Sequence, residues 1–170
     1  MSEQHVKGLR ELQSFLDKLP AKLEANVMRG ALRAGAMKEL LPEAQANLMQ
    51  HGAVKSGGLI AGLKVGTRSR GGKVTSYVKA GGPHGYLARW IEYGVRAHNI
   101  AAKKSGWLSF MNVFAKEVAH PGIAPRPFLR PALDRSGTAA VNEAARYMRE
   151  RLATKNGLDT SGVILDGDEL

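Results

Sequence analysis

The sequence predicts an α+β protein in which a long N-terminal helix and a C-terminal helix pack on an antiparallel sheet of about four strands. Three observations predict this class. Apolar residues recur every three to four positions near both ends of the chain, as in helices that bury one face. Between them, over 63–79, apolar and polar residues alternate, as in half-buried strands. The glycine pair Gly71-Gly72 divides this alternating stretch, as a hairpin turn would.

The chain of 170 residues is long enough for one domain with a hydrophobic core. We expect N-terminal helices over 1–50 and an α+β core over 51–153 that includes the C-terminal helix. These two parts form a single domain. Residues 154–170 have little apolar content and end in the acidic sequence DGDEL, which predicts a mobile acidic tail.

The first helices follow from apolar spacing and from two prolines. Residues 5–19 carry a short amphipathic pattern, and Pro20 precedes a second, longer pattern over about 21–50. Pro42 lies inside the longer pattern and predicts a kink, because proline removes one helical hydrogen bond.

The alternating stretch predicts a hairpin whose strands are centred on Val65 and Ser76. Four basic residues gather toward its turn: Lys64, Arg68, Arg70 and Lys73. Such charges protect an exposed sheet edge from aggregation. They also suit an arm that contacts phosphate or an acidic neighbour, and the sequence leaves both interpretations open.

Residues 85–94 predict a short helix that ends at Gly94, a favourable helix cap. Leu87, Trp90 and Ile91 share one face of it. Trp90 and Tyr93 suggest either core or interface positions. An exposed basic loop is expected over 98–106, and a second hairpin over 107–119.

The stretch HPGIAPRPFLRPALD (120–134) is stiffened by four prolines. Each proline disfavours helix in the residue before it, so we expect Arg126 and Arg130 to be extended and Pro131 to open the last helix. Phe128-Leu129 is the bulky apolar pair of this stretch. It anchors the stretch either on the core of its own domain or on a neighbouring subunit.

The formal net charge of +10 is unevenly distributed. Between Gln45 and Leu133 there are 13 Lys or Arg and two acidic residues, a balance that attracts polyanions or an acidic protein face. The chain has no cysteine, which excludes disulfides and thiolate sites. It has no signal-peptide pattern and no apolar run of membrane-spanning length, so we expect a soluble protein made in a cytoplasm.

The sequence predicts no catalytic residue, no cofactor and no metal. No two of the five histidines stand at a metal-binding helical spacing, and carboxylates are scarce in the middle of the chain. The glycines of VGTRSRGGK (65–73) do not follow the order of a phosphate-binding loop. The aromatic residues are not interleaved with basic ones, as a stacking platform for nucleic acid requires. We therefore expect neither an enzyme nor a small-molecule substrate.

Two segments, in their order along the chain, carry a resemblance to a known family. YLARWIEYG (86–94) is followed by RPFLRPAL (126–133), which opens the last helix. Over about residues 20–155 the chain resembles the tail-completion or head–tail joining (neck) minor tail-component proteins of long-tailed bacteriophages. In that family a Y-A-x-x-x-E-x-G-like helix precedes a Pro-Phe-Leu-x-Pro-Ala segment.

The resemblance implies a structural virion protein that forms a ring, typically a hexamer, at the head-proximal end of the tail. Such a ring completes the tail and joins it to the head. Its implied partners are further copies of the chain, neighbouring tail and neck proteins, and the DNA that passes through the channel. Assembly would take place in the host cytoplasm, with no membrane involved.

The resemblance also suggests roles for two sets of residues. The subunit interface would include Arg126, Pro127, Phe128, Leu129, Arg130, Trp90 and Tyr93. The basic hairpin would face the DNA channel or an acidic partner. Two alternatives remain: a tail terminator that caps the tail tube, and a basic nucleic-acid-binding protein of a different class. The last predicts salt-sensitive DNA binding that is lost when Arg68, Arg70 and Lys73 are changed.

Overall fold

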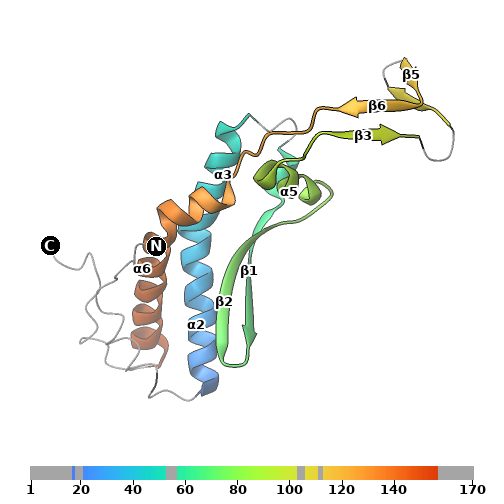
Figure 1. Ribbon diagram of the computed structural model, residues 1–170. Coiled ribbons are helices and arrows are strands. Elements are labelled where there is room, and N and C mark those ends of the chain that lie inside the picture. Colours follow the sequence, from blue (N-terminus) through green and yellow to red (C-terminus); the bar gives the residue numbers. More distant parts are fainter. Residues whose placement is uncertain (1–16, 18–20, 53–56, 103–105, 111–112, 157–170) are drawn as a thin grey trace.

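The computed structural model describes residue 17 and residues 21–52, 57–102, 106–110 and 113–156, and its fold class is α+β, as predicted (Figure 1). The helices are α2 (Ala21–Gly35), the π-helical turn η1 (Ala36–Leu40), α3 (Leu41–Gln50), α4 (Gly58–Ala61), α5 (Gly85–Tyr93) and α6 (Leu129–Asn156). The strands are β1 (Leu63–Arg70), β2 (Lys73–Ala80), β3 (His98–Ala101), β4 (Leu108–Phe110), β5 (Val113–Ala115) and β6 (Glu117–His120). The predicted helix over 5–19 lies outside the described residues.

The long predicted helix over 21–50 is present as α2, η1 and α3 in succession. The turn η1 ends two residues before Pro42, and the N–H of Leu41 bonds to the carbonyl of Ala36, five residues back. Proline cannot donate a hydrogen bond, and a wider π turn is one way for a helix to accommodate such a break. The feature at the predicted kink is therefore a π-helical turn.

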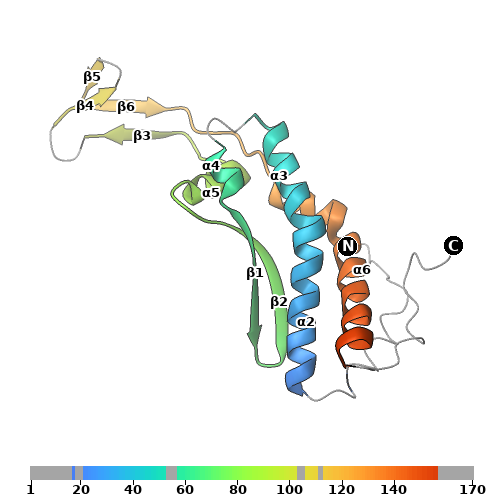
Figure 2. The same cartoon turned by 180° about the vertical axis from the view of Figure 1, so that it is seen from behind.

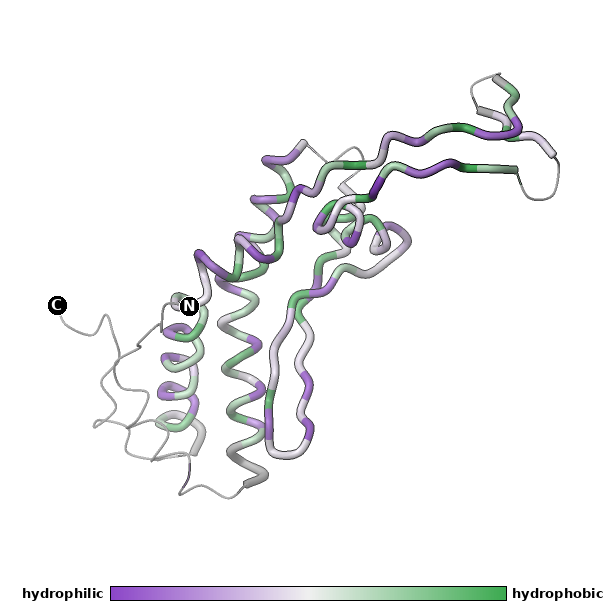
Figure 3. The backbone as a smooth tube through the Cα atoms, viewed as in Figure 1, coloured by the Kyte–Doolittle hydropathy of each residue, from purple (hydrophilic) through white to green (hydrophobic). Residues whose placement is uncertain are grey.

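The main helical core lies between α2 and α6, which run side by side (Figures 1 and 2). Small side chains on both helices let them approach closely, and Val27, Met148 and Leu152 are the larger buried side chains between them. The buried members are Val27, Ala31, Ala144, Ala145, Met148 and Leu152. Figure 3 shows apolar residues along this pair of helices.

The hairpin β1–β2 lies on the other side of α2 from α6 (Figures 1 and 2). Its strands pair antiparallel, with Val65 opposite Val78, and Leu63 and Val65 are buried. Gly71 and Gly72 form the predicted two-residue turn, with φ values of 56° and 75°. Positive φ at both central positions is the mark of a hairpin turn of type I′.

The remaining strands form a narrow arm that projects away from the helices (Figures 1 and 2). Strand β3 pairs with β6, and the small hairpin β4–β5 lies at the end of the arm. Within the described residues, the six strands form three separate two-stranded sheets, so the expected single sheet of about four strands is wrong. The hairpin β1–β2 is covered by α2, whereas the arm extends out of its reach.

Two boundaries also differ from the predictions. The stretch expected as a loop over 98–106 contains β3. Its pattern alone does not predict a strand, because its partner β6 lies nearly 20 residues further along the chain. Helix α6 continues to Asn156, so the first three residues assigned to the acidic tail are helical. Residues 157–170 lie outside the described part of the chain.

Candidate assembly interface

Phe128 lies at the centre of a second core, between α3, α4, α5 and the start of α6. Its side chain has 0% exposure, and its buried neighbours are Ala44, Leu48, Leu59, Leu63, Ala88 and Ala132. A fully enclosed ring leaves no surface for a neighbouring subunit. The structure therefore favours the core interpretation of Phe128 and corrects its assignment to the subunit interface. Leu129 is half-buried and packs against the same cluster.

Glu92 on α5 holds the start of α6. Its carboxylate accepts the backbone N–H of Phe128 at 2.7 Å, of Leu129 at 2.9 Å and of Arg130 at 3.3 Å. The next residue, Pro131, has no N–H. Helix N-termini leave such donors without internal partners, and a side chain of the N-cap residue usually accepts them. Phe128 has no oxygen in its side chain, so Glu92 supplies the cap from a different helix.

The same carboxylate forms an ion pair with Arg130, whose Nε lies 3.1 Å from Oε1 of Glu92. The guanidinium of Arg130 also lies over the ring of Tyr93, 5.0 Å from its centroid. Burial of Glu92 raises its pKa, but the hydrogen bonds from Leu129, Phe128 and Arg130 together outweigh burial, so the pKa lies below its usual value. Glu92 is thus a charged, 3% exposed side chain whose oxygens are fully engaged.

Further hydrogen bonds attach the proline segment to α3 and α5. The side-chain amide of Asn47 donates to the carbonyl of Phe128 at 3.2 Å, and Nε2 of His51 lies 3.1 Å from the carbonyl oxygen of Pro127. Arg126 donates from its guanidinium to the carbonyl of His51 at 3.0 Å, and from its backbone to the carbonyl of Ile91 at 2.7 Å.

The two arginines that were expected to contact a neighbour therefore have carboxylate and carbonyl partners within their own chain. Helix α6 begins at Leu129, two residues before the expected start at Pro131. Arg130 is therefore helical, and the expected extended conformation is wrong. The reason is Glu92, which accepts the N–H groups of Phe128, Leu129 and Arg130 and so stabilises a helical turn that starts before Pro131. Pro131 then lies within the first turn of α6, where proline is tolerated.

The root of the arm is closed by backbone contacts between its two legs. Val95 and Ile123 exchange backbone hydrogen bonds of 2.9 and 2.8 Å. Gly94 and Gly122 have φ values of 73° and 85°, and a Cβ atom at either would lie within 2.6 Å of a carbonyl oxygen on the opposite leg. Only glycine fits at both positions. The arm thus leaves α5 at Gly94, two residues after Glu92, and the chain returns to residues 128–130, which Glu92 holds.

Beyond this root the arm has little core of its own. All four residues of β3 and the first three of β6 are exposed. Large apolar side chains are exposed along it: Ile100, Trp107, Phe114, Val118 and Ile123. An isolated two-stranded ribbon is marginally stable in water, and exposed apolar side chains mark interaction sites. The arm is a candidate contact surface that the sequence search did not recognise.

The other predicted interface residues lie on α5. Trp90 is 44% exposed and Tyr93 is 67% exposed, so neither belongs to the core. Tyr86 packs edge-on against Trp90, with ring centroids 5.2 Å apart. These exposed aromatic rings lie on the helix from which the arm emerges, and they remain candidates for contact with a partner.

The basic hairpin presents its charge to solvent. Lys64, Arg68, Arg70 and Lys73 are all exposed, and residues 63–80 include no acid. The turn lies at the end of the hairpin that is remote from the arm (Figure 1). The hairpin and the proline segment are thus separate surfaces, and the structure does not bring their predicted site residues together.

Within the described residues, no group of three or more His, Asp or Glu side chains is placed to hold a metal ion. No helix in the described part of the chain has both the length and the apolar character of a membrane span. No family model, curated protein or solved structure significantly matches the chain.

Proposed function

We propose that the chain is a structural virion subunit that assembles with further copies of itself into a ring at the head-proximal end of a phage tail, completing the tail and joining it to the head. This proposal extends the resemblance carried by residues 86–94 and 126–133. A ring of about six subunits is expected, in contact with neighbouring tail and neck proteins. A tail terminator, which would also be a ring at that end, is the alternative within the same class.

The projecting arm is the observation that supports assembly best. Its two legs are joined at the root by the bonds between Val95 and Ile123, while its apolar side chains face solvent. Exposed apolar side chains are unfavourable in an isolated subunit. Their burial against a neighbouring subunit is favourable, so they mark a contact surface. The returning chain is fixed to α5 by the bond from the N–H of Arg126 to the carbonyl of Ile91, and Glu92 holds Phe128 and Leu129 just beyond it. These bonds give the arm a defined direction, which a repeated contact around a ring requires.

Assembly is tested by the mass of the purified protein in solution. Light scattering at low and at high salt should give about six subunits, and negative-stain images of the same samples should show rings. Because the arm contacts are mainly apolar, high salt should not dissociate the rings. A monomer at both salt concentrations that also fails to join tails in an added tail preparation would contradict the proposal.

The exposed basic hairpin supports the second candidate function, binding of nucleic acid. The structural role predicts weak or no binding of duplex DNA by the isolated protein. A DNA-binding protein would bind with an affinity that falls steeply with salt, because released counterions drive such binding. The triple change of Arg68, Arg70 and Lys73 to Ser should then abolish it.

A triple change of Arg29, Arg89 and Arg96 to Ser is the matched control, since it removes the same charge from exposed positions elsewhere. Titration of a labelled duplex at two salt concentrations measures both triple variants. Strong, salt-sensitive binding that only the hairpin variant loses would favour the nucleic-acid function over the structural one.

A further inference from the structure

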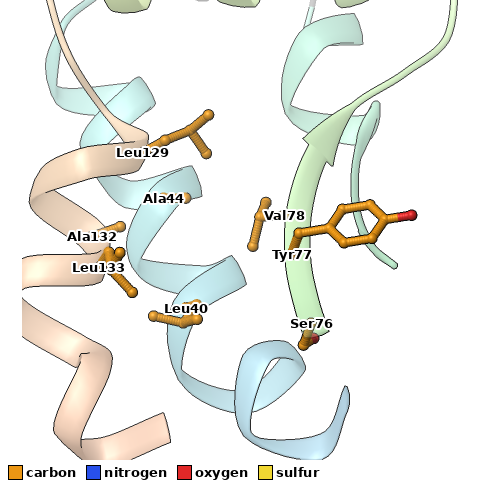
Figure 4. Close-up of a pocket in the computed structure, with 8 residues that line it drawn as sticks. All are labelled: Leu40, Ala44, Ser76, Tyr77, Val78, Leu129, Ala132 and Leu133. Carbon is orange, nitrogen blue, oxygen red and sulfur yellow. The ribbon is translucent and has the colours of Figure 1, made fainter. Parts of the chain in front are cut away.

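An apolar groove lies between the helices and the second strand of the basic hairpin (Figure 4). It has a volume of about 250 Å³, and most of its lining comes from aliphatic side chains of η1, α3, α6 and β2: Leu40, Ala44, Val78, Leu129, Ala132 and Leu133. Tyr77 points its ring away from this space in Figure 4. Leu133 at the rim is 58% exposed, so the groove is open to solvent.

The end of the arm presents one face with two aromatic rings and a cation. Ser109 is paired with Phe114 across the β4–β5 hairpin, and cross-strand partners lie on the same face. Trp107 lies two residues before Ser109 and Lys116 two residues after Phe114, each just outside its strand. The Nζ of Lys116 lies 5.6 Å from the ring centroid of Trp107, which places them on this face too. Phe114 is 65% exposed and Trp107 is 54% exposed.

The size and chemistry of this face match the groove. A buried apolar cavity of about 150 Å³ is known to hold a benzene molecule. The larger groove here has room for one aromatic side chain of the arm. An aromatic ring that is buried removes about 150–250 Å² from water, which makes it a strong anchor at an interface.

The charges are complementary as well. By sequence, the arm over 95–123 has four basic residues (Arg96, Lys103, Lys104 and Lys116) and one acid (Glu117), hence a net charge of +3. Five charged residues directly precede or follow a groove residue in the sequence: the acids Glu39, Glu43 and Asp134, and the bases Lys79 and Arg130. Glu43 pairs with Arg135, and Arg130 pairs with Glu92. Lys79 follows Val78 on β2, and successive side chains of a strand point to opposite faces, so Lys79 lies on the face away from the groove. The helices that line the groove thus contribute more acid than base, and a cationic face is attracted to them.

The arm cannot reach the groove of its own chain. It projects from α5 away from the helices, whereas the groove lies beside α3, α6 and β2 (Figures 1 and 2). The two surfaces can meet only when they belong to different copies.

We propose that the Trp107–Phe114 face of one copy binds the groove around Leu133 of the next copy. This inference rests on the proposed function and names the contact that builds the ring. Two different surfaces meet, so the contact is head-to-tail, and repetition around a rotation axis closes a ring. In this contact Lys116 lies toward Glu39 and Asp134, which flank the groove residues Leu40 and Leu133 in the sequence.

Single changes on either surface test the contact. Phe114→Ala and Leu133→Asp should each weaken self-association at least about tenfold, as measured by sedimentation at several concentrations. The controls are Ser109→Ala, on the same face of the arm, and Val141→Asp, an exposed residue further along α6. Circular dichroism verifies that each variant is folded. Variants with wild-type assembly would overturn the contact while leaving the ring in place.

A mixture of the two variants tests the direction of the contact. Phe114→Ala retains an intact groove, and Leu133→Asp retains an intact arm. Mixed, they can form one good contact and no more, so the expected product is a dimer containing one copy of each. A mixture that remains monomeric, or that forms full rings, would contradict a head-to-tail contact.

Engineered cysteines locate the contact directly, because the natural chain has none. The double variant with Ser109→Cys and Leu133→Cys should give a ladder of crosslinked oligomers under oxidation that ends at the ring size. The control pairs Ser109→Cys with Val141→Cys and should give none. Rings without a ladder would overturn this inference and leave the proposed function in place. That outcome would be expected if residues 1–20 of the same chain filled the groove. Absence of both rings and ladder would overturn the proposed function as well.

Discussion

Replacement of Glu92 by alanine is expected to lower the free energy of unfolding by about 2–3 kcal/mol, because a helix cap is lost and buried N–H donors are left without an acceptor. The ion pair adds little to this, since the Arg130 side chain that remains is 62% exposed. The change removes the acceptor of three backbone N–H groups and the partner of Arg130. Glu92→Gln keeps one acceptor oxygen and should lose about half as much. Urea unfolding followed by circular dichroism measures both variants.

Glu117→Ala is the matched control, because Glu117 is an exposed carboxylate on the arm. Its effect should stay within about 0.5 kcal/mol, as for most surface changes. Equal stabilities of the Glu92 and Glu117 variants would mean that the helix cap contributes little, and that the apolar core alone holds the start of α6.

The cap also predicts a dependence on pH. The pKa of Glu92 in the folded state is lowered from 4.5, its usual value, so its contribution to stability is fully present above about pH 4.5. That contribution is lost as the pH falls from 4.5 through the lowered pKa of the folded state. The wild-type protein should therefore lose stability more steeply than Glu92→Gln over this acidic range. Parallel slopes would argue against a charged Glu92.

Replacement of Phe128 by alanine should lower the free energy of unfolding by about 3–5 kcal/mol, because it leaves a cavity among Ala44, Leu48 and Leu59. The effect should be on the stability of the monomer, since the ring has no exposed surface. Thermal or urea unfolding of the dilute protein measures it. Self-association of the fraction that remains folded should be unchanged.

Phe114→Ala is the informative comparison, because it removes the same side chain from an exposed position on the arm. It should leave the free energy of unfolding within about 0.5 kcal/mol of wild type and weaken assembly instead. The two phenylalanines thus separate folding from assembly. The opposite pattern, with assembly lost in Phe128→Ala alone, would restore the proline segment as the contact between subunits.

Much of the architecture was predictable because it depends on local sequence. The helices over 21–50 and 129–156 follow from apolar spacing, and the turn of the first hairpin follows from Gly71-Gly72. The stiffness and the apolar anchor of the proline segment were also recognised. These features are properties of neighbouring residues, so a pattern of the right period is sufficient to reveal them.

The partners of the candidate site were not predictable in the same way. Glu92 stands three residues after Arg89, a spacing at which exposed charges can pair across one turn of a helix. It instead lies buried and bonds to Phe128, Leu129 and Arg130, 36 to 38 residues away. Sequence spacing does not encode which carboxylate faces inward. A glutamate near the end of a short, mostly apolar helix was the available signal.

The arm shows the same division between local and distant interactions. By itself the sequence determined the α+β class, the long helices, the basic hairpin and the apolar anchor of the proline segment. Only the tertiary structure decided that 95–123 extends as a ribbon, that Phe128 is enclosed by its own chain and that a groove opens beside Leu133. The physical reason is that burial and strand pairing between residues far apart in sequence depend on how the whole chain packs, and that packing is not visible in any single segment.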